Sequence, residues 1–374
     1  MRLLKMEFYK IAYRPVMNLG FLLMTGIFLL ILYQEAAGTR TEIDGKVYYG
    51  LEAVAKERSL AREYEGIFTL EKAEEIVERF GFSGYIGGEM VRVREGNFCN
   101  QFVTDKMTDF FQTEKRPDKF SEEENYGKIY LEGNFRFGYT RGWEKLLEVW
   151  HLAVIFLNIW LILMVSPVFS EEYSRNTTEI LLTAKKGKSE DIRRKTEAVM
   201  ALGILSYLLM MAFLLGVTAV IYGGEGLGAG ASGNYTMYGK AGIWSVGFFL
   251  FIQFLTGLAS VLLNVSIALY LSSKCMRPVS AVTAGMFLYL LPCGMNEILF
   301  QMMAGMGAAN YFWGWILMDM IRIYCFSMPI YLPNPGILFI PSNWLKYIPV
   351  LASAVLLLCI WRGYQNYRNY DKSR

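Results

Sequence analysis

Six long apolar runs are the feature that most constrains how this chain of 374 residues folds. A helix crosses the hydrocarbon core of a bilayer with about 20 mostly apolar residues. Runs close to that length lie at residues 17–33, 149–169, 198–222, 241–271, 279–300 and 347–361. We therefore predict an all-α polytopic membrane protein with six transmembrane helices.

Charge is concentrated between the first two runs, in residues 34–148, which we call the charged block. It holds 17 of the 37 Lys and Arg residues and 23 of the 34 Asp and Glu residues, so its net charge is −6 while the rest of the chain carries +9. The formal charge of +3 is thus a cancellation. Outside the block the basic residues flank apolar runs, which argues against a protein that binds nucleic acid.

The Lys and Arg residues near the apolar runs predict the topology, because cytoplasmic loops carry an excess of both. One side collects 17 of them, in residues 1–16, 170–197, 272–278 and 362–374, whereas the short loops on the other side hold only three. We expect both termini in the cytoplasm and the charged block outside. The predicted location is the plasma membrane, which in a bacterium is the inner or cytoplasmic membrane.

Two segments leave alternatives open. A secretory signal is an alternative for residues 17–33, because Ala36 and Ala37 follow, although no typical cleavage site does. In the outer loop 301–346, residues 311–326 begin apolar and aromatic and then become charged. We predict a re-entrant or interfacial helix there, with a seventh span as the alternative.

The charged block has the pattern of a folded domain. Residues 51–64 and 70–80 predict helices, the second with Thr69 as N-cap and Gly81 just after its end. Residues 129–137 alternate around a Gly-Asn pair, which predicts a two-residue hairpin. We expect an inserted α/β or α+β extracytoplasmic domain of 115 residues, large enough to fold on its own.

Catalytic, metal and nucleotide sites are not expected. His151 is the only histidine and the five cysteines show no C-x-x-C spacing, which argues against zinc sites and a disulfide framework. Gly187-Lys188-Ser189 resembles the end of a Walker A motif, but Leu182 stands where its first glycine belongs. The glycine-rich run 223–233 is expected to be a flexible outer loop. We expect no enzyme activity and no cofactor or metal bound by this chain.

Residues 170–197, here called the charged loop, combine side chains of both charges with an apolar centre at Ile180-Leu181-Leu182. A short helix with an apolar patch rimmed by charges is suited to docking on a partner protein. A solvated connector is the alternative, and composition does not decide between them.

The charged loop resembles the cytoplasmic signature of the ABC-2-type transporter permeases. The matching positions are Phe169, Glu172, Thr177, Glu179, Leu181, Leu182, Thr183 and Lys195. Asn176 replaces the family's usual glycine, and Asn is the next most tolerant of positive φ, so the turn is expected to survive. Thr178 and Lys185-Lys186 depart from the pattern. The layout is similar too, with six spans, a basic amphipathic helix at residues 1–16, a large outer domain and a membrane-entering hairpin before the last span.

The resemblance implies a transport subunit in a lipid membrane. Permeases of this family work in pairs, which implies a homodimer or a paired sister permease. Each docks on a separate ABC ATPase subunit, which binds the ATP and Mg and powers export. The coupling residues that we assign on this basis are Glu171, Glu172, Thr177, Glu179, Leu181 and Leu182, helped by the N-terminal helix. Glu297, a carboxylate in the fifth span, is a candidate for the substrate path.

A function of a different class stays open. The chain could be a membrane-anchored receptor or assembly factor whose extracytoplasmic domain binds a ligand, with the charged loop as a solvated connector. Nothing in the sequence selects a substrate, and nothing in it decides between a homodimer and a heterodimer.

Overall fold

The computed structural model describes residues 2–87, 92–123, 127–132, 134–184, 187–234, 244–304, 312–333 and 347–370. The chain divides into two compact units, which are described separately. Unit 1 comprises Met1–Thr25, His151–Met211 and Gln253–Arg374. Unit 2 comprises Gly26–Trp150 and Ala212–Ile252.

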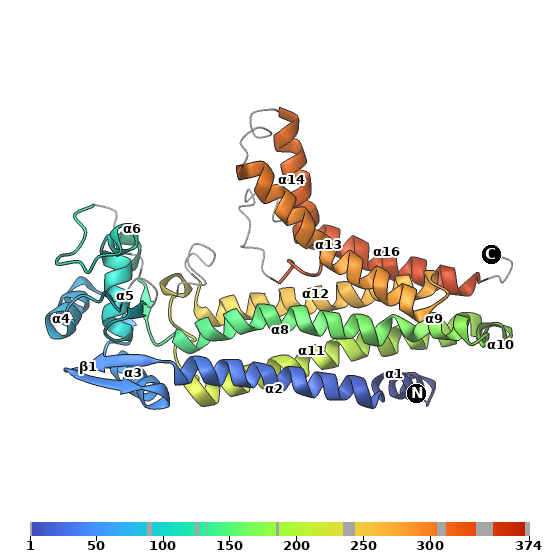
Figure 1. Cartoon of the computed structure of the whole chain (residues 1–374), viewed down its shortest axis with the longest axis horizontal. Coiled ribbons are helices and arrows are strands. Elements are labelled where there is room, and N and C mark those ends of the chain that lie inside the picture. Colours follow the sequence, from blue (N-terminus) through green and yellow to red (C-terminus); the bar gives the residue numbers. More distant parts are fainter. Residues whose placement is uncertain are drawn as a thin grey trace. The chain divides into compact units, whose positions relative to one another are not determined.

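Long helices dominate the structure. They are α2 (Pro15–Ala37), α8 (Arg141–Val165), α11 (Ile192–Tyr222), α12 (Val246–Lys274), α13 (Pro278–Ala304) and α16 (Ile348–Arg368) (Figure 1). Among the described residues, six helical stretches are long and apolar enough to span a membrane, and each covers all or most of one of these helices. The prediction of a multi-pass membrane protein with six such helices is confirmed.

Several of these helices extend past their apolar runs into charged sequence. α8 begins at Arg141 rather than at residue 149, α11 begins at Ile192 rather than at residue 198, and α16 continues to Arg368. Lys and Arg have high intrinsic helix propensity, so a span continues as a helix after its apolar residues end. The charged ends of α11 and α16 therefore have fixed geometry, which matters for the site below.

The segment before the last span contains α14 (Phe312–Ser327), which packs against α13 and α16. The 16 residues of α14 give a length of about 24 Å, which is shorter than the roughly 30 Å hydrocarbon core. Met318, Ile321 and Phe326 are buried in a cluster with residues of α13 and α16. The re-entrant or interfacial helix and the seventh span both stay predictions. Tyr311 and the end of the loop lie outside the described residues.

The charged block combines short helices with three separate two-stranded antiparallel sheets. The helices are α3 (Gly50–Glu63), α4 (Leu70–Phe80), α5 (Phe98–Met107), α6 (Phe110–Thr113) and α7 (Lys128–Leu131). The paired strands are β1 (Arg40–Ile43) with β2 (Lys46–Tyr49), β3 (Gly66–Ile67) with β6 (Arg136–Phe137), and β4 (Tyr85–Ile86) with β5 (Val93–Arg94). The predicted helices at 51–64 and 70–80 are confirmed by α3 and α4.

The predicted hairpin at residues 129–137 is wrong. Lys128–Leu131 forms α7, and β6 pairs with β3 instead of with its neighbour in sequence. Of the alternating apolar residues, Phe135 and Phe137 are buried in the core of unit 2, whereas Ile129 is 53% exposed, so the alternation does not mark one buried face of a hairpin. Period-2 patterns in such short segments do not tell a strand from a turn of helix.

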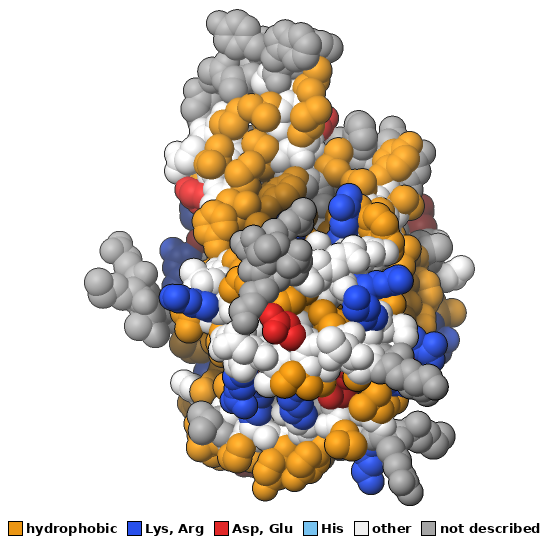
Figure 2. Space-filling model, turned by 90° about the vertical axis from the view of Figure 1, so that its right-hand side faces the viewer, with side chains coloured by type: hydrophobic (Ala, Val, Ile, Leu, Met, Phe, Trp, Pro, Cys, Tyr) orange, Lys and Arg blue, Asp and Glu red, His pale blue; other side chains and the backbone are white. Residues whose placement is uncertain are grey.

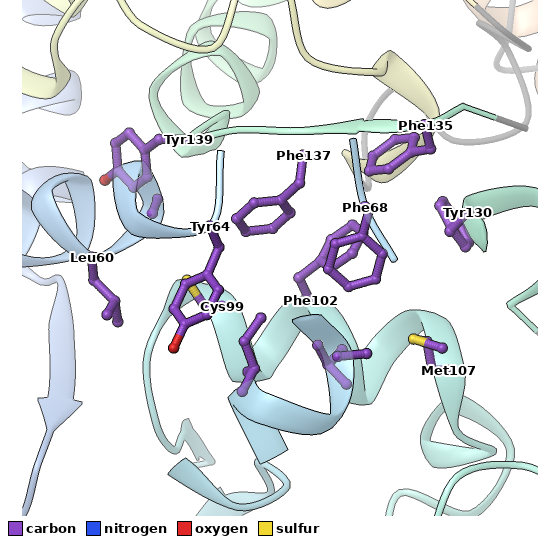
Figure 3. Packing of buried hydrophobic residues seen from close by; sticks show 14 of the residues in the cluster. Leu60, Tyr64, Phe68, Cys99, Phe102, Met107, Tyr130, Phe135, Phe137 and Tyr139 are labelled. Atoms are coloured by element: carbon purple, nitrogen blue, oxygen red, sulfur yellow. The ribbon is translucent and has the colours of Figure 1, made fainter. Parts of the chain in front are cut away.

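That core is rich in aromatic side chains. Phe102 on α5 lies with its ring centroid 5.1 Å from Phe68, 5.6 Å from Phe135 and 5.0 Å from Phe137. Figure 3 shows these rings pointing toward one another between α5 and the β3–β6 pair. Aromatic pairs at this spacing contribute about 0.5–1.5 kcal/mol beyond the area that they bury. They hold the elements of the charged block around one core.

The start of α4 offers a local test of the fold. Thr69 is extended at the N-cap, and its Oγ1 accepts a hydrogen bond from the Lys72 amide at 3.4 Å, while Gly81 follows the helix with φ 68°. Both positions are as predicted. Thr69→Ala removes the cap and is expected to lower the free energy of unfolding by about 1 kcal/mol. Thermal unfolding in detergent measures the change, and an increase in stability would contradict the assignment.

Candidate functional site

The charged loop folds into a compact series of short helices within unit 1. α9 (Pro167–Ser174) follows α8 after a break at Ser166, α10 (Thr178–Thr183) comes next, and the π-helix η1 (Gly187–Asp191) leads into α11. The corner between α9 and α10 depends on Asn176, whose φ is 57°. The expectation that Asn176 takes a positive φ in this turn is confirmed.

Gly187 brings η1 against α10. A Cβ at this position would lie 1.7 Å from the carbonyl oxygen of Leu181 and 3.2 Å from the Cα of Leu182. Only a glycine fits so close to a neighbouring backbone. The glycine that resembles the end of a Walker A motif therefore serves the packing of the loop.

A buried ion cluster centred on Glu172 anchors the loop. The Oε2 atom of Glu172 accepts hydrogen bonds from the Nζ of Lys195 on α11 at 3.0 Å and from the hydroxyl of Tyr367 on α16 at 2.5 Å. Lys195 also donates to Asp191 at 2.5 Å. The side chains of Lys195 and Glu172 are 1% and 6% exposed. Partnered in this way, the buried charges are compensated.

The amphipathic helix α1 (Arg2–Ala12) packs on the same cluster. Lys10 donates to the Oε1 atom of Glu172 at 3.0 Å, so this carboxylate is shared by α1, α11 and α16. Arg14, just after α1, lies 3.4 Å from Glu171. Ile11 is buried, whereas Lys5 is exposed, as expected for the predicted helix at residues 1–16.

A pocket of about 380 Å³ lies between α1 and the α9–α10 segment. Its apolar wall comes from Ile11, Val168 and Leu181, with Ile180 at its edge. Charged side chains line the rest of the pocket. Three are acidic, Glu7, Glu171 and Glu172, and three are basic, Lys10, Arg14 and Arg175. Burial raises the pKa of Glu7, and Lys195 and Lys10 oppose that shift. The pocket could receive an apolar side chain while surrounding polar groups bind its neighbours.

The structure brings the six predicted coupling residues together but gives them different environments. Glu171 and Glu172 lie on α9, Thr177 precedes α10, and Glu179, Leu181 and Leu182 lie on α10. Glu172 and Leu182 are buried, Glu171, Thr177 and Leu181 are half-buried, and Glu179 is exposed. The most exposed apolar side chain of α10 is Ile180, at 72%, which the sequence placed in the apolar centre of the loop.

Glu297, the residue assigned to the substrate path, is not part of this site. It lies on α13, where it is exposed and accepts a hydrogen bond from Gln301 at 2.9 Å. Its partner is one helical turn away, a common arrangement on a helix surface.

Three functional side chains of the cluster were missed from the sequence. Lys10, Asp191 and Tyr367 contact Glu172 or Lys195, yet they come from the N-terminal helix, from η1 and from the expected C-terminal tail. Tyr367 had no local signal, because it lies 195 residues from its partner Glu172. Continuation of α16 beyond its apolar run is the only signal that could have placed it.

The face of unit 1 that carries this loop and both described chain ends is rich in Lys and Arg. Figure 2 shows these side chains gathered over it, with few acidic ones between them. In the parts of the chain that are described, no group of three or more His, Cys, Asp or Glu side chains could hold a metal ion. The arrangement can bind a protein surface, and its buried charges can fix the direction of α9 and α10.

No protein-family model, curated protein or solved structure matches this chain.

Proposed function

We propose that this chain is the transmembrane permease subunit of an ATP-binding cassette exporter, powered by a separate ATPase subunit. The observation that carries the proposal is the pocket between α1 and α9–α10, at a basic end of unit 1, in a chain with six candidate spans. α10 and most of α9 lie in the segment that resembles the ABC-2-type signature, from Phe169 to Lys195.

In this proposal the basic end of unit 1 and both termini are cytoplasmic, and the charged block is an α/β or α+β extracytoplasmic domain. The membrane is the plasma membrane. The chain has no enzyme activity, and a second copy or a sister permease completes the transporter. ATP and Mg bind to the ATPase subunit alone.

The mechanism requires that the loop bind the ATPase differently in two states, since a ligand shifts an equilibrium only by its difference in affinity for them. Ile180, Leu181 and the pocket provide the contact surface. α9 follows α8 after the break at Ser166, and η1 leads from the α10 side into α11, so a displacement of α10 is passed to two spans. Export then follows from the changed arrangement of the spans.

Replacement of Ile180 by Asp tests the contact surface. Because Ile180 is 72% exposed, the change should leave the fold intact. A charge on the apolar anchor is expected to weaken binding by about 2 kcal/mol or more, which is roughly 30-fold in affinity. The measurement is co-purification of a Walker A ATPase with the full-length chain, and the stimulation of its ATP hydrolysis.

The matched control is Ile129→Asp, the same change at an isoleucine of unit 2 that is 53% exposed. It should leave ATPase association unchanged. Failure of the wild-type chain to bind any ATPase would overturn the proposal. Equal association of the Ile180 and Ile129 variants would overturn the docking surface.

A second candidate function rests on another pocket. Unit 2 contains a cavity of about 420 Å³ between α5 and the start of α8, lined by aromatic side chains and by charges that include Arg94, Asp105 and Arg141. A concave site with apolar walls and a few polar groups is typical of ligand binding. If no ATPase associates with the chain, this pocket makes a membrane-anchored receptor the preferred function.

A further inference from the structure

The two oxygens of the Glu172 carboxylate have different kinds of partner, and the resemblance of the charged loop does not account for this difference. The two oxygens face different elements. Oε2 accepts from Lys195 and Tyr367, whose side chains are buried, and Oε1 accepts from Lys10, whose side chain is 52% exposed. Oε2 is therefore paired with buried partners, whereas Oε1 is paired with a lysine that is partly exposed to water.

The Oε2 side holds α9 against α16 and α11. The ring of Tyr367 lies 4.4 Å from that of Phe169 and 5.6 Å from that of Tyr173, centroid to centroid. The Tyr173 hydroxyl donates to the carbonyl of Ser273 at the end of α12. Aromatic packing and charge-assisted hydrogen bonds thus act on the same helix. α9 has one orientation in which all of these contacts form.

The Oε1 side holds α1. Lys10 and Glu172, and Arg14 and Glu171, form the ion pairs between α1 and α9, and both pairs border the pocket. Partly exposed ion pairs are individually weak and break readily. One side of the pocket between α1 and α9–α10 is therefore formed by α1, which these weak ion pairs hold in place.

We infer that Glu172 is a positioning residue that joins a fixed arm, made by Lys195 and Tyr367, to a releasable arm, made by Lys10 on α1. This inference rests on the proposed function, because it assigns Glu172 the task of setting the shape of the docking pocket. The carboxylate acts from inside the loop and does not itself contact the ATPase. The C-terminal end of α16 becomes part of the coupling apparatus.

Glu172→Gln is the informative variant, because it keeps the size of the side chain. The amide oxygen can still accept from Lys195 and Tyr367, but the amide nitrogen then faces Lys10 and cannot accept from it. α1 should detach more often, so trypsin is expected to cleave after Lys10 about tenfold faster in the full-length chain. Arg14 is followed by proline and resists trypsin, so Lys10 is the last cleavable site of α1, and the fragment cut after Lys10 is quantified apart from those cut after Arg2 and Lys5.

The functional readout separates positioning from general damage. In Glu172→Gln, the concentration of the chain needed for half-maximal stimulation of the co-purified ATPase should rise about tenfold, while the maximal rate is kept. A merely structural defect would lower the maximal rate and leave the half-maximal concentration unchanged. Tyr367→Phe loosens the fixed arm and should give the same type of change, and it serves if the Gln variant does not fold.

Glu197→Gln is the matched control, because Glu197 pairs with Arg193 and Arg194 on the surface of α11. It should match the wild type in both readouts. Cleavage rates and half-maximal concentrations that are equal in the Glu172 and Glu197 variants would overturn the inference. If the wild-type chain stimulates no ATPase, the proposed function fails, and the cleavage rates alone still decide whether Glu172 fastens α1.

Discussion

Gly187→Ala adds one methyl group to the charged loop, and we expect it to disrupt the loop more than a methyl group added at any other position of it. The new Cβ would lie 1.7 Å from the Leu181 carbonyl oxygen, a contact that neither backbone can relieve without moving α10 away from η1. Clashes with a buried backbone belong to the small set of changes with large costs, so we expect a loss of about 3 kcal/mol or more in the local stability of α10.

Amide hydrogen exchange measures this loss directly, because the exchange rate of each amide reports the free energy of local opening at that residue. The amides of Leu181, Leu182 and Thr183 should exchange more than about 100-fold faster in Gly187→Ala. Gly216→Ala is the control, since a Cβ at Gly216 in α11 meets nothing within 4 Å. That change should be neutral or stabilise the helix by up to about 1 kcal/mol. Unchanged protection of α10 in the Gly187 variant would contradict the packing described above.

The membrane-spanning part of the fold was predictable, because a single property decides it. An apolar run of about 20 residues has few stable environments other than a bilayer, whatever its tertiary partners. Local rules also succeeded where the interaction is local: Thr69 caps α4 through an amide three residues away, and Asn176 takes the positive φ of a turn. These features depend on neighbouring residues only.

The features that depend on distant residues were not predictable. β6 pairs with β3, which lies about 70 residues earlier in the chain, so the alternation at 129–137 pointed to the wrong partner. In the candidate site, the loop pattern drew attention to Glu172 but could not show that its carboxylate is buried among Lys10, Lys195 and Tyr367. Charged residues in a loop ordinarily face water, and burial of this one follows only from the meeting of four elements.

A second buried carboxylate, Glu57 on α3, carries the other large expected effect. It is fully buried in unit 2, where its Oε2 atom lies 3.1 Å from the Nε of Arg141 and 3.5 Å from the hydroxyl of Tyr139. Burial raises the pKa of Glu57, and Arg141 opposes the shift. Since the folded-state pKa is raised, the stability that comes from protonation of Glu57 is complete below its ordinary pKa and is lost as the pH rises through the folded-state value.

Glu57→Leu should therefore have two consequences that can be measured separately. Above the folded-state pKa, where Glu57 is ionised, it leaves the Arg141 guanidinium without its buried counter-ion, which is expected to cost about 3–5 kcal/mol. It also removes the contribution of Glu57 to the fall in stability with rising pH. Thermal unfolding of the full-length chain in detergent, from pH 4 to pH 8, records both.

The double variant Glu57→Leu/Arg141→Leu distinguishes a broken ion pair from a misfit of leucine. Replacing both members of a buried pair by apolar groups is often neutral or stabilising, so the double variant should recover most of the loss. Glu63→Leu is the surface control: Glu63 is 55% exposed and pairs with Arg79 at 3.0 Å, and its loss should cost at most about 1 kcal/mol. A double variant as unstable as Glu57→Leu alone would mean that the carboxylate is held for its packing rather than for its charge, because the unpaired guanidinium would then account for none of the cost.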